Sequence, residues 1–140
     1  MNIPNLNPDF AVKIKQIKET CIYIRNLDQA RDFYHGLLRL PIISHVEGKH
    51  IFFRVGTSVL LCFNPDDSRN KKSPPPHFVE GKYHFAFEVA AEDYEMEEQS
   101  LITKGILITD EVIWKRGLKS CYFEDPVGNV LEIVPEGIWD

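Results

Sequence analysis

The sequence lacks most features that mark proteins of membranes, of nucleic-acid complexes and of the oxidising extracellular space. Its 16 basic residues are scattered and outnumbered by 21 acidic ones, for a net charge of −5, so nucleic acid and anionic membranes are poor partner candidates. No apolar run approaches the roughly 20 residues of a membrane span. Residues 1–12 carry no signal-peptide pattern and predict a loose lead-in. Three cysteines without metal-type spacing are typical of reduced thiols, so we expect a cytoplasmic protein.

The chain does have enough apolar residues for one domain, since 44% of its 140 residues are hydrophobic. Its patterns follow one order twice: strand, helix, three strands. The expected elements of the first unit are a strand at 16–24, a helix that Asp28 caps and Pro41 limits, and strands at 42–47, 50–55 and 58–63. After a polar, proline-rich loop at 64–82, the second unit has a strand at 83–89, a helix at 92–104, a strand at 106–114 and a hairpin at 120–135.

This order predicts an α+β fold with mostly antiparallel sheets, each covered on one face by its helix. The other face of each sheet must also be buried, against the other sheet or against a second subunit. A pair of curved half-barrels around a central cleft meets that requirement.

The hairpin places a carboxylate in an apolar strand. Glu132 stands among the aliphatic residues of 130–134, and both faces of that strand are otherwise apolar. A buried carboxylate needs a cation, a hydrogen-bond donor or a proton. The alternative is an edge strand with Glu132 in water.

Two further polar residues occupy equivalent positions in the two units. Glu19 precedes Asp28, at the start of the first helix, by nine residues, and His84 precedes Asp93, at the start of the second helix, by nine. Each lies on the face opposite the one that suits its helix. A single strand glutamate or histidine is usually solvated, but repeat-related positions favour a shared role.

Glu132 has its counterpart in the first unit at about Leu60. Glu19, His84 and Glu132 are therefore candidates to converge on one cleft, with Leu60 in the fourth place. Two carboxylates and one imidazole suit one divalent ion, Mn²⁺, Fe²⁺, Zn²⁺ or Ni²⁺.

Three stretches, at 19–34, 84–87 and 122–132, resemble the vicinal oxygen chelate superfamily, which includes glyoxalases, fosfomycin and bleomycin resistance proteins and extradiol dioxygenases. The ending at 132–139 resembles an uncharacterised bacterial glyoxalase-like subgroup. The resemblance implies one domain over 1–140 with paired βαβββ modules, at about 13–64 and 82–139, joined by a loop at about 65–81. It also implies a homodimer and a metal ion in the cleft, with Glu19, His84 and Glu132 as ligands.

Departures from the family bear on the activity. The lactoylglutathione lyases carry a fourth ligand, a glutamate, where this chain has Leu60. Fosfomycin-resistance transferases match at Ser120 and Tyr122 but have threonine at the place of Cys21, and their late arginine would fall beyond Asp140.

Our leading hypothesis is a metal-dependent lyase or isomerase that acts on a small oxygen-bearing substrate through a metal-stabilised enolate or alkoxide. Glu19 or Glu132 would act as general base, and Tyr122 would donate a hydrogen bond. The alternatives are an Fe(II) extradiol-type dioxygenase and a metal-independent protein that binds a small molecule or drug.

Further candidates for substrate contact are Cys21, Leu60, Trp114, Arg116 and Ser120. The alternatives are a core position for Cys21, strand packing for Ser120 and turn exposure for Arg116. His77, in the polar loop, is a candidate lid residue or a solvated histidine.

Overall fold

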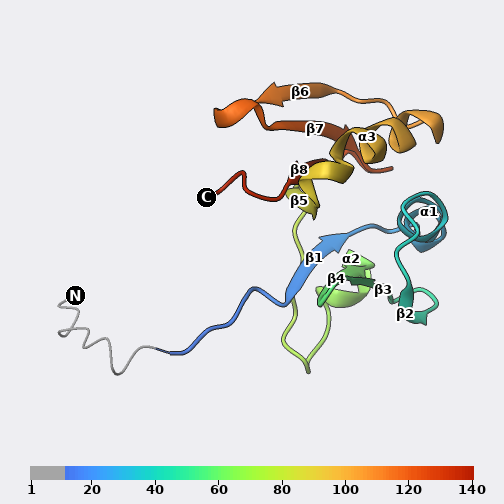
Figure 1. The fold of residues 1–140 in the computed structure, drawn as a ribbon. Coiled ribbons are helices and arrows are strands. Elements are labelled where there is room, and N and C mark those ends of the chain that lie inside the picture. Colours follow the sequence, from blue (N-terminus) through green and yellow to red (C-terminus); the bar gives the residue numbers. More distant parts are fainter. Residues whose placement is uncertain (1–11) are drawn as a thin grey trace.

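The computed structural model describes residues 12–140, so the predicted lead-in lies, apart from residue 12, outside the described residues. The chain forms two βαβββ modules, each with a four-stranded sheet (Figure 1). The elements of the first module are β1 (Glu19–Tyr23), α1 (Leu27–Ala30), the π-helix η2 (Arg31–Leu37), β2 (Ile42–Val46), β3 (His50–Val55) and β4 (Ser58–Phe63). Those of the second are β5 (His84–Val89), the 3-10 turn η3 (Ala91–Asp93), α3 (Tyr94–Thr103), β6 (Asp110–Ile113), the 3-10 turn η4 (Lys115–Gly117), β7 (Lys119–Glu124) and β8 (Val130–Pro135).

The two sheets have the same topology. Their strand orders are β1-β4-β3-β2 and β5-β8-β7-β6, and the modules correspond strand for strand. Within each sheet the first strand of the module pairs in parallel with the last, while the other pairs are antiparallel. The predicted α+β fold with a duplicated strand–helix–three-strand unit is therefore confirmed, and each sheet is mixed.

Some predicted element boundaries were wrong for local reasons. The first helix begins at Leu27 because Asn26, and not Asp28, caps it by accepting a hydrogen bond from the Gln29 amide at 3.1 Å. Asp93 likewise makes no capping bond with its side chain. The strand predicted at 106–114 is limited to Asp110–Ile113.

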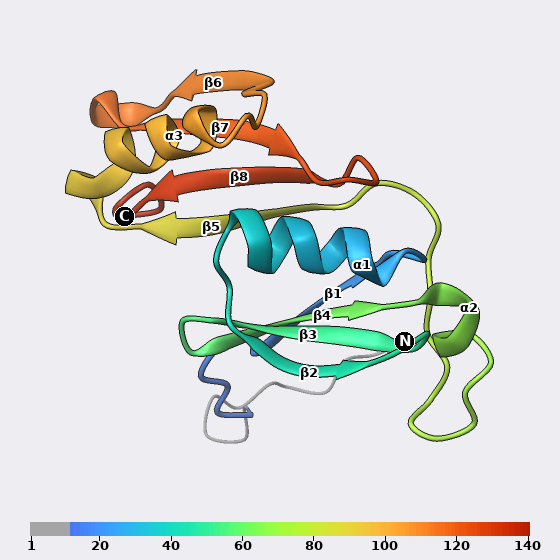
Figure 2. The same ribbon diagram turned by 90° about the vertical axis from the view of Figure 1, so that its right-hand side faces the viewer.

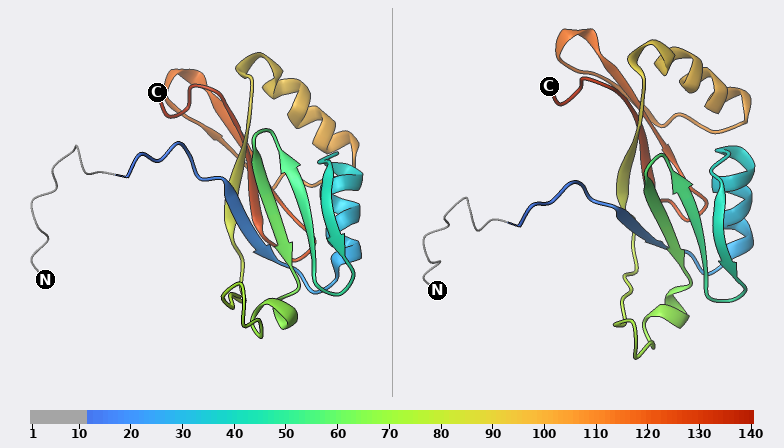
Figure 3. Two further views of the ribbon diagram at one scale, coloured as in Figure 1. Left: turned by 90° about the horizontal axis from the view of Figure 1, so that it is seen from below. Right: turned by 60° about the horizontal axis from the view of Figure 1, so that its bottom comes forward.

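One buried cluster joins the two modules. The sides of both sheets that face the helices contribute to it, together with side chains of α1, η2 and α3. Figure 2 shows α1 between β5–β8 and β3–β4, and the rings of Phe33 in η2 and Phe123 in β7 lie 6.5 Å apart. Figure 3 shows α1 and α3 on the same side of the strands. The opposite faces of the two sheets lie away from the helices, and a site can form there.

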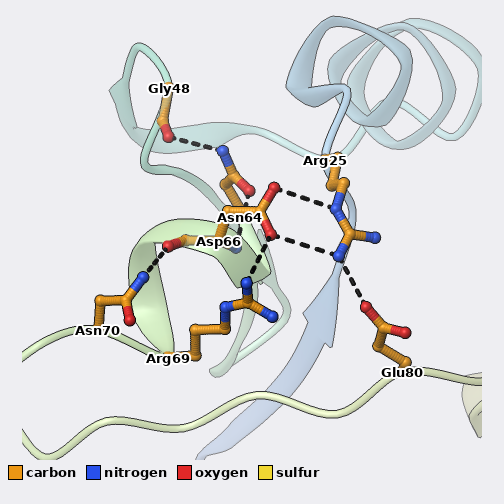
Figure 4. Close-up of polar contacts among 7 residues, drawn as sticks. All are labelled: Arg25, Gly48, Asn64, Asp66, Arg69, Asn70 and Glu80. Carbon is orange, nitrogen blue, oxygen red and sulfur yellow. Dashed lines mark hydrogen bonds and ion pairs between the residues drawn. The ribbon is translucent and has the colours of Figure 1, made fainter.

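The predicted loop at 64–82 contains a short helix, α2 (Pro65–Ser68), and is tied to the end of β1. Arg25 donates to Asp66 at 3.1 Å and to Glu80 at 2.7 Å, as Figure 4 shows. All three side chains are exposed, so each contact adds little stability in water, but together they fix both ends of the loop.

No helix among residues 12–140 has the length and apolar character needed to cross a membrane.

Candidate metal centre

A hydrogen-bonded turn sets the register of β8. The Asp125 carboxylate accepts from the amides of Val127 and Asn129 at 3.1 and 2.8 Å and from the Asn129 side-chain amide at 2.8 Å. The Asn129 side-chain oxygen in turn accepts from the Tyr83 amide at 2.9 Å, which ties the turn to the residue before β5. This register pairs Ala86 of β5 with Glu132 of β8.

That register brings His84 and Glu132 together. The Nε2 atom of His84 lies 3.2 Å from Oε1 of Glu132, whose side chain is only 7% exposed. The other ring nitrogen, Nδ1, lies 2.8 Å from the carbonyl oxygen of Val130. Because a carbonyl only accepts, Nδ1 carries the hydrogen, and Nε2 of a neutral ring presents a lone pair to the carboxylate. Two facing acceptors repel, so this contact requires a proton or a cation between them.

The donor set fits a metal ion by two criteria. Histidine ligands almost always donate their second ring N–H to a carboxylate, carbonyl or water, as His84 does to Val130. Two ligand atoms about 2.0–2.1 Å from one ion lie roughly 3.3 Å apart in tetrahedral coordination, and the observed separation is 3.2 Å. Half of the His84 side chain is exposed, so an ion can reach the pair from solvent.

A hollow of about 320 Å³ opens over this pair, and Tyr122 and Trp114 are among its lining residues. Tyr122 lies opposite Glu132 in the pairing of β7 with β8, and its ring stacks near the His84 ring at 5.9 Å. Burial, and next the adjacent Glu132, raise the pKa of Tyr122. Its hydroxyl is therefore a hydrogen-bond donor at neutral pH.

Glu19 does not lie beside His84 and Glu132. It is exposed on β1, in the other sheet, and residues 12–140 contain no group of three or more His, Cys, Asp or Glu side chains that could hold a metal ion. One chain thus brings together two of the three predicted ligands. Cys21 is half-buried on the same face of β1 as Glu19; burial and, to a smaller extent, the Glu19 charge raise its pKa.

The prediction that Leu60 is the counterpart of Glu132 was wrong by one residue, as the strand pairing shows. In the second sheet, His84 pairs with Val130, and Glu132 follows two residues later. In the first sheet, Glu19 pairs with Val59, so the equivalent position is Leu61, opposite Cys21. Leu60 is 2% exposed and belongs to the buried cluster. It lines a separate hollow of about 360 Å³ whose lining includes no histidine or cysteine.

Three other candidates lie near the turn before β7. Ser120 is fully buried and accepts a 2.8 Å hydrogen bond from Nε1 of Trp114. Arg116 is not among the lining residues of the hollow; it instead bonds to the backbone of Gly137. Trp139 also lines the hollow. Trp139 was not predicted as a site residue, although the sequence places this large aromatic residue shortly after the strand of Glu132.

His77 is half-buried, and its Nδ1 lies 2.8 Å from the hydroxyl of Tyr23. Its ring meets the Phe63 ring edge-on at 4.5 Å. Tyr23 shares a face of β1 with Glu19, so the loop covers the end of that face. His77 is therefore not a fully solvated histidine, and its role as a lid residue stays a prediction.

Known proteins share this architecture. Residues 16–133 match the Glyoxalase/Bleomycin resistance protein/Dioxygenase superfamily. The chain is 28% identical over 124 residues to a glutathione transferase, FosA, of Serratia marcescens, covering 86% of this chain and 80% of FosA. A lactoylglutathione lyase structure from Agrobacterium tumefaciens superimposes with a TM-score of 0.85 at 28% identity, covering 91% of this chain and 98% of the lyase.

A glyoxalase/bleomycin resistance protein/dioxygenase from Nocardioides superimposes with a TM-score of 0.71 at 19% identity, covering 93% of this chain and 90% of the other; at that identity it shows the fold alone. The family match spans most of the sequence and both modules. The chain therefore belongs to the glyoxalase/bleomycin resistance protein/dioxygenase superfamily.

Proposed function

We propose that this protein is a metal-dependent enzyme that acts on a small oxygen-bearing substrate by lyase or isomerase chemistry. The observation that carries the proposal is the contact between Nε2 of His84 and Oε1 of Glu132, at 3.2 Å, with the Nδ1 hydrogen committed to Val130. A buried carboxylate that faces an imidazole lone pair is half of a binding site for a divalent ion.

A second copy of the chain completes the site in this proposal. Glu19 occupies in the first module the position that His84 occupies in the second, since each begins its strand and pairs with the first part of the neighbouring parallel strand. Within one chain, residues 12–140 bring no third His, Cys, Asp or Glu side chain to the pair. A homodimer that places the first module of one copy against the second module of the other brings Glu19 to the pair.

The bound ion would polarise adjacent substrate oxygens and stabilise negative charge that develops there. The residues of this chain then have separate roles. His84 and Glu132 would hold the ion and so fix where the substrate oxygens bind. Glu19, which is the exposed one of the two carboxylates, accepts a proton as general base, because an exposed side chain can move between two positions. Tyr122 donates a hydrogen bond to the substrate.

The relatives bear on the reaction. FosA and the lyase from A. tumefaciens are both named for chemistry on glutathione or its conjugates. The present chain has leucine, Leu61, at the position that pairs opposite Cys21 and corresponds to Glu132, so a fourth carboxylate ligand is missing there. We infer a reaction of the same broad type with a different coordination shell.

The test is metal content. Protein purified without a metal-affinity tag is dialysed against each candidate ion and analysed for bound metal. Glu132→Gln keeps the shape and removes the charge; we expect metal affinity to fall by more than the roughly 10–100-fold that loss of an outer-shell partner costs. Glu124→Gln, an exposed carboxylate at the end of β7, is the matched control and should bind normally. Full metal occupancy in Glu132→Gln would disprove the site.

Subunit mixing tests the shared site. Glu19→Gln and Glu132→Gln homodimers should each bind poorly. Unfolding and refolding the two together forms heterodimers that keep one intact site, with Glu19 from one copy and Glu132 from the other. Recovery of metal in the mixture supports a site between subunits, and no recovery excludes it.

Oxygen uptake measured on the same samples with a catechol separates dioxygenase chemistry from lyase chemistry.

A further inference from the structure

Both tryptophans of the chain line the hollow over His84 and Glu132. Trp114 is 42% exposed, and its Nε1–H is bonded to the fully buried Ser120 hydroxyl at 2.8 Å. This bond fixes the indole without using its faces. The ring of Trp114 is therefore held in place with a face open to the hollow.

Trp139 is held through hydrogen bonds to the backbone on either side of it. The guanidinium of Arg116 donates through Nη2 to the carbonyl of Gly137 and, at 3.3 Å, to the backbone oxygen of Asp140. These bonds bracket Trp139 in the segment 136–140, and the amide of Asp140 closes a turn on the Gly137 carbonyl at 3.2 Å. Trp139 as a residue is 93% exposed, so its indole has a large apolar surface that a ligand could still bury.

We propose that Trp114 and Trp139 form a clamp that selects substrates with a flat ring, and that Arg116 is the positioning residue that holds Trp139 over the site. The proposal rests on the proposed function, because the oxygen-bearing end of such a substrate would bind at His84 and Glu132. The ring would extend from that end between the two indoles.

Size and chemistry of the hollow favour a single ring. Its volume of about 320 Å³ is at the small end of the range of about 300–1,000 Å³ for ligand pockets. Besides the two indoles, its wall includes the Tyr122 ring stacked near His84, and the remaining wall is mainly aliphatic. Offset or edge-to-face contacts with aromatic rings stabilise a flat ring beyond what burial of its area provides.

The clamp predicts a preference that a matched pair of probes can measure. Mandelate and lactate share the same adjacent hydroxyl and carboxylate oxygens and differ in a phenyl against a methyl group. Since Trp114 and Trp139 are the two tryptophans of the chain, their fluorescence reports directly on the hollow. We expect metal-loaded protein to bind mandelate roughly 5–150-fold more tightly than lactate, as two aromatic contacts of roughly 0.5–1.5 kcal/mol each imply.

Variants separate the clamp from general structure. Trp139→Ala and Arg116→Asn should each reduce the mandelate-to-lactate preference to about the square root of its value in the parent protein, roughly 2–12-fold, as expected when one of two aromatic contacts is lost, with metal content unchanged. Asparagine is chosen because Arg116 has a φ of 62°, which asparagine tolerates better than alanine. Arg116→Lys keeps a cationic donor and should retain part of the preference. Lys115→Asn, in the same turn, is the control and should bind like the parent protein.

The outcomes are distinguishable. Normal metal binding with equal affinity for the two probes, or an unchanged preference in Trp139→Ala and Arg116→Asn, overturns the clamp and leaves the metal site standing. A phenyl preference in a protein that binds no metal overturns the proposed function and supports the clamp. If Trp139→Ala weakens self-association by sedimentation and leaves the preference unchanged, Trp139 contacts a second copy and the clamp is wrong.

Discussion

The buried bond between Tyr34 and Asp125 offers a direct test of how the two modules are joined. The Tyr34 hydroxyl, in η2, donates to Oδ2 of Asp125, in the turn between β7 and β8, at 2.7 Å. Tyr34 is 0% exposed and Asp125 6%. Burial, followed by the charge of Asp125, raises the pKa of Tyr34 well above its usual value, so the hydroxyl donates at every pH at which the protein is studied.

Tyr34→Phe removes this donor and very little apolar area. Oδ2 of Asp125 keeps its 2.8 Å bond from the Asn129 side chain, so the charge is not left without partners. The expected loss is then that of one hydrogen bond to a charged group, about 1.5–3 kcal/mol of unfolding free energy. For a domain of this size that corresponds to roughly 5–12 °C in Tm.

Urea unfolding followed by far-UV circular dichroism measures the change, at one fixed protein concentration because self-association adds to apparent stability. Tyr94→Phe is the matched control. Tyr94 is 4% exposed, and its buried hydroxyl has no hydrogen-bond partner among the residues that the structure describes. Tyr94→Phe should therefore leave the unfolding free energy unchanged or raise it, because a buried hydroxyl without a partner costs about 1–3 kcal/mol. Equal losses in the two variants would refute the argument, since they would show that the Asp125 bond contributes nothing specific.

Two further predictions concern the closing turn and the thiols. Gly128 has a φ of +86°, so Gly128→Ala should lower the unfolding free energy by about 1–2 kcal/mol from left-handed strain, measurable by the same urea titration; an unchanged midpoint would contradict it. Burial raises the pKa of Cys62 to about 12 and of Cys121 to about 11. The pKa of Cys21 is also raised, but Cys21 is half-buried whereas Cys62 and Cys121 are buried, so a chromogenic disulfide reagent at pH 8 should label Cys21 first. Labelling of all three thiols at one rate would contradict this order.

Local chemistry explains why much of the fold could be predicted. The turn at 125–129 consists of residues that favour turns, and its apolar flanks alternate as strands do, so the hairpin and the position of Glu132 followed from the sequence. The equivalence of Glu19 and His84 was predicted by counting to Asp28 and Asp93, although Asn26 and not Asp28 caps the first helix. The structure supports it differently, since each residue begins the strand that pairs in parallel with the last strand of its module. The residue at which the first helix begins was less predictable. Asn26 and Asp28 are both good capping residues, and the geometry of the turn before the helix selects one of them.

The assumed position of Leu60 shows the limit of such counting. A shift of one residue moves a side chain to the other face of a strand. The register of β1 against β4 that makes Leu61 the counterpart of Glu132 is set by pairing between segments about 40 residues apart. No local pattern in residues 58–63 contains that information.

By itself the sequence determined the duplicated unit, the polar residues that oppose each helix and the carboxylate in the last strand, because periodicity and turn chemistry act over short distances. Only the tertiary structure decided that His84 and Glu132 meet while Glu19 lies on the other sheet, and that Arg116 holds the backbone around Trp139. Those outcomes depend on sheet register and on packing between the modules, and both are set by contacts between residues far apart in the sequence.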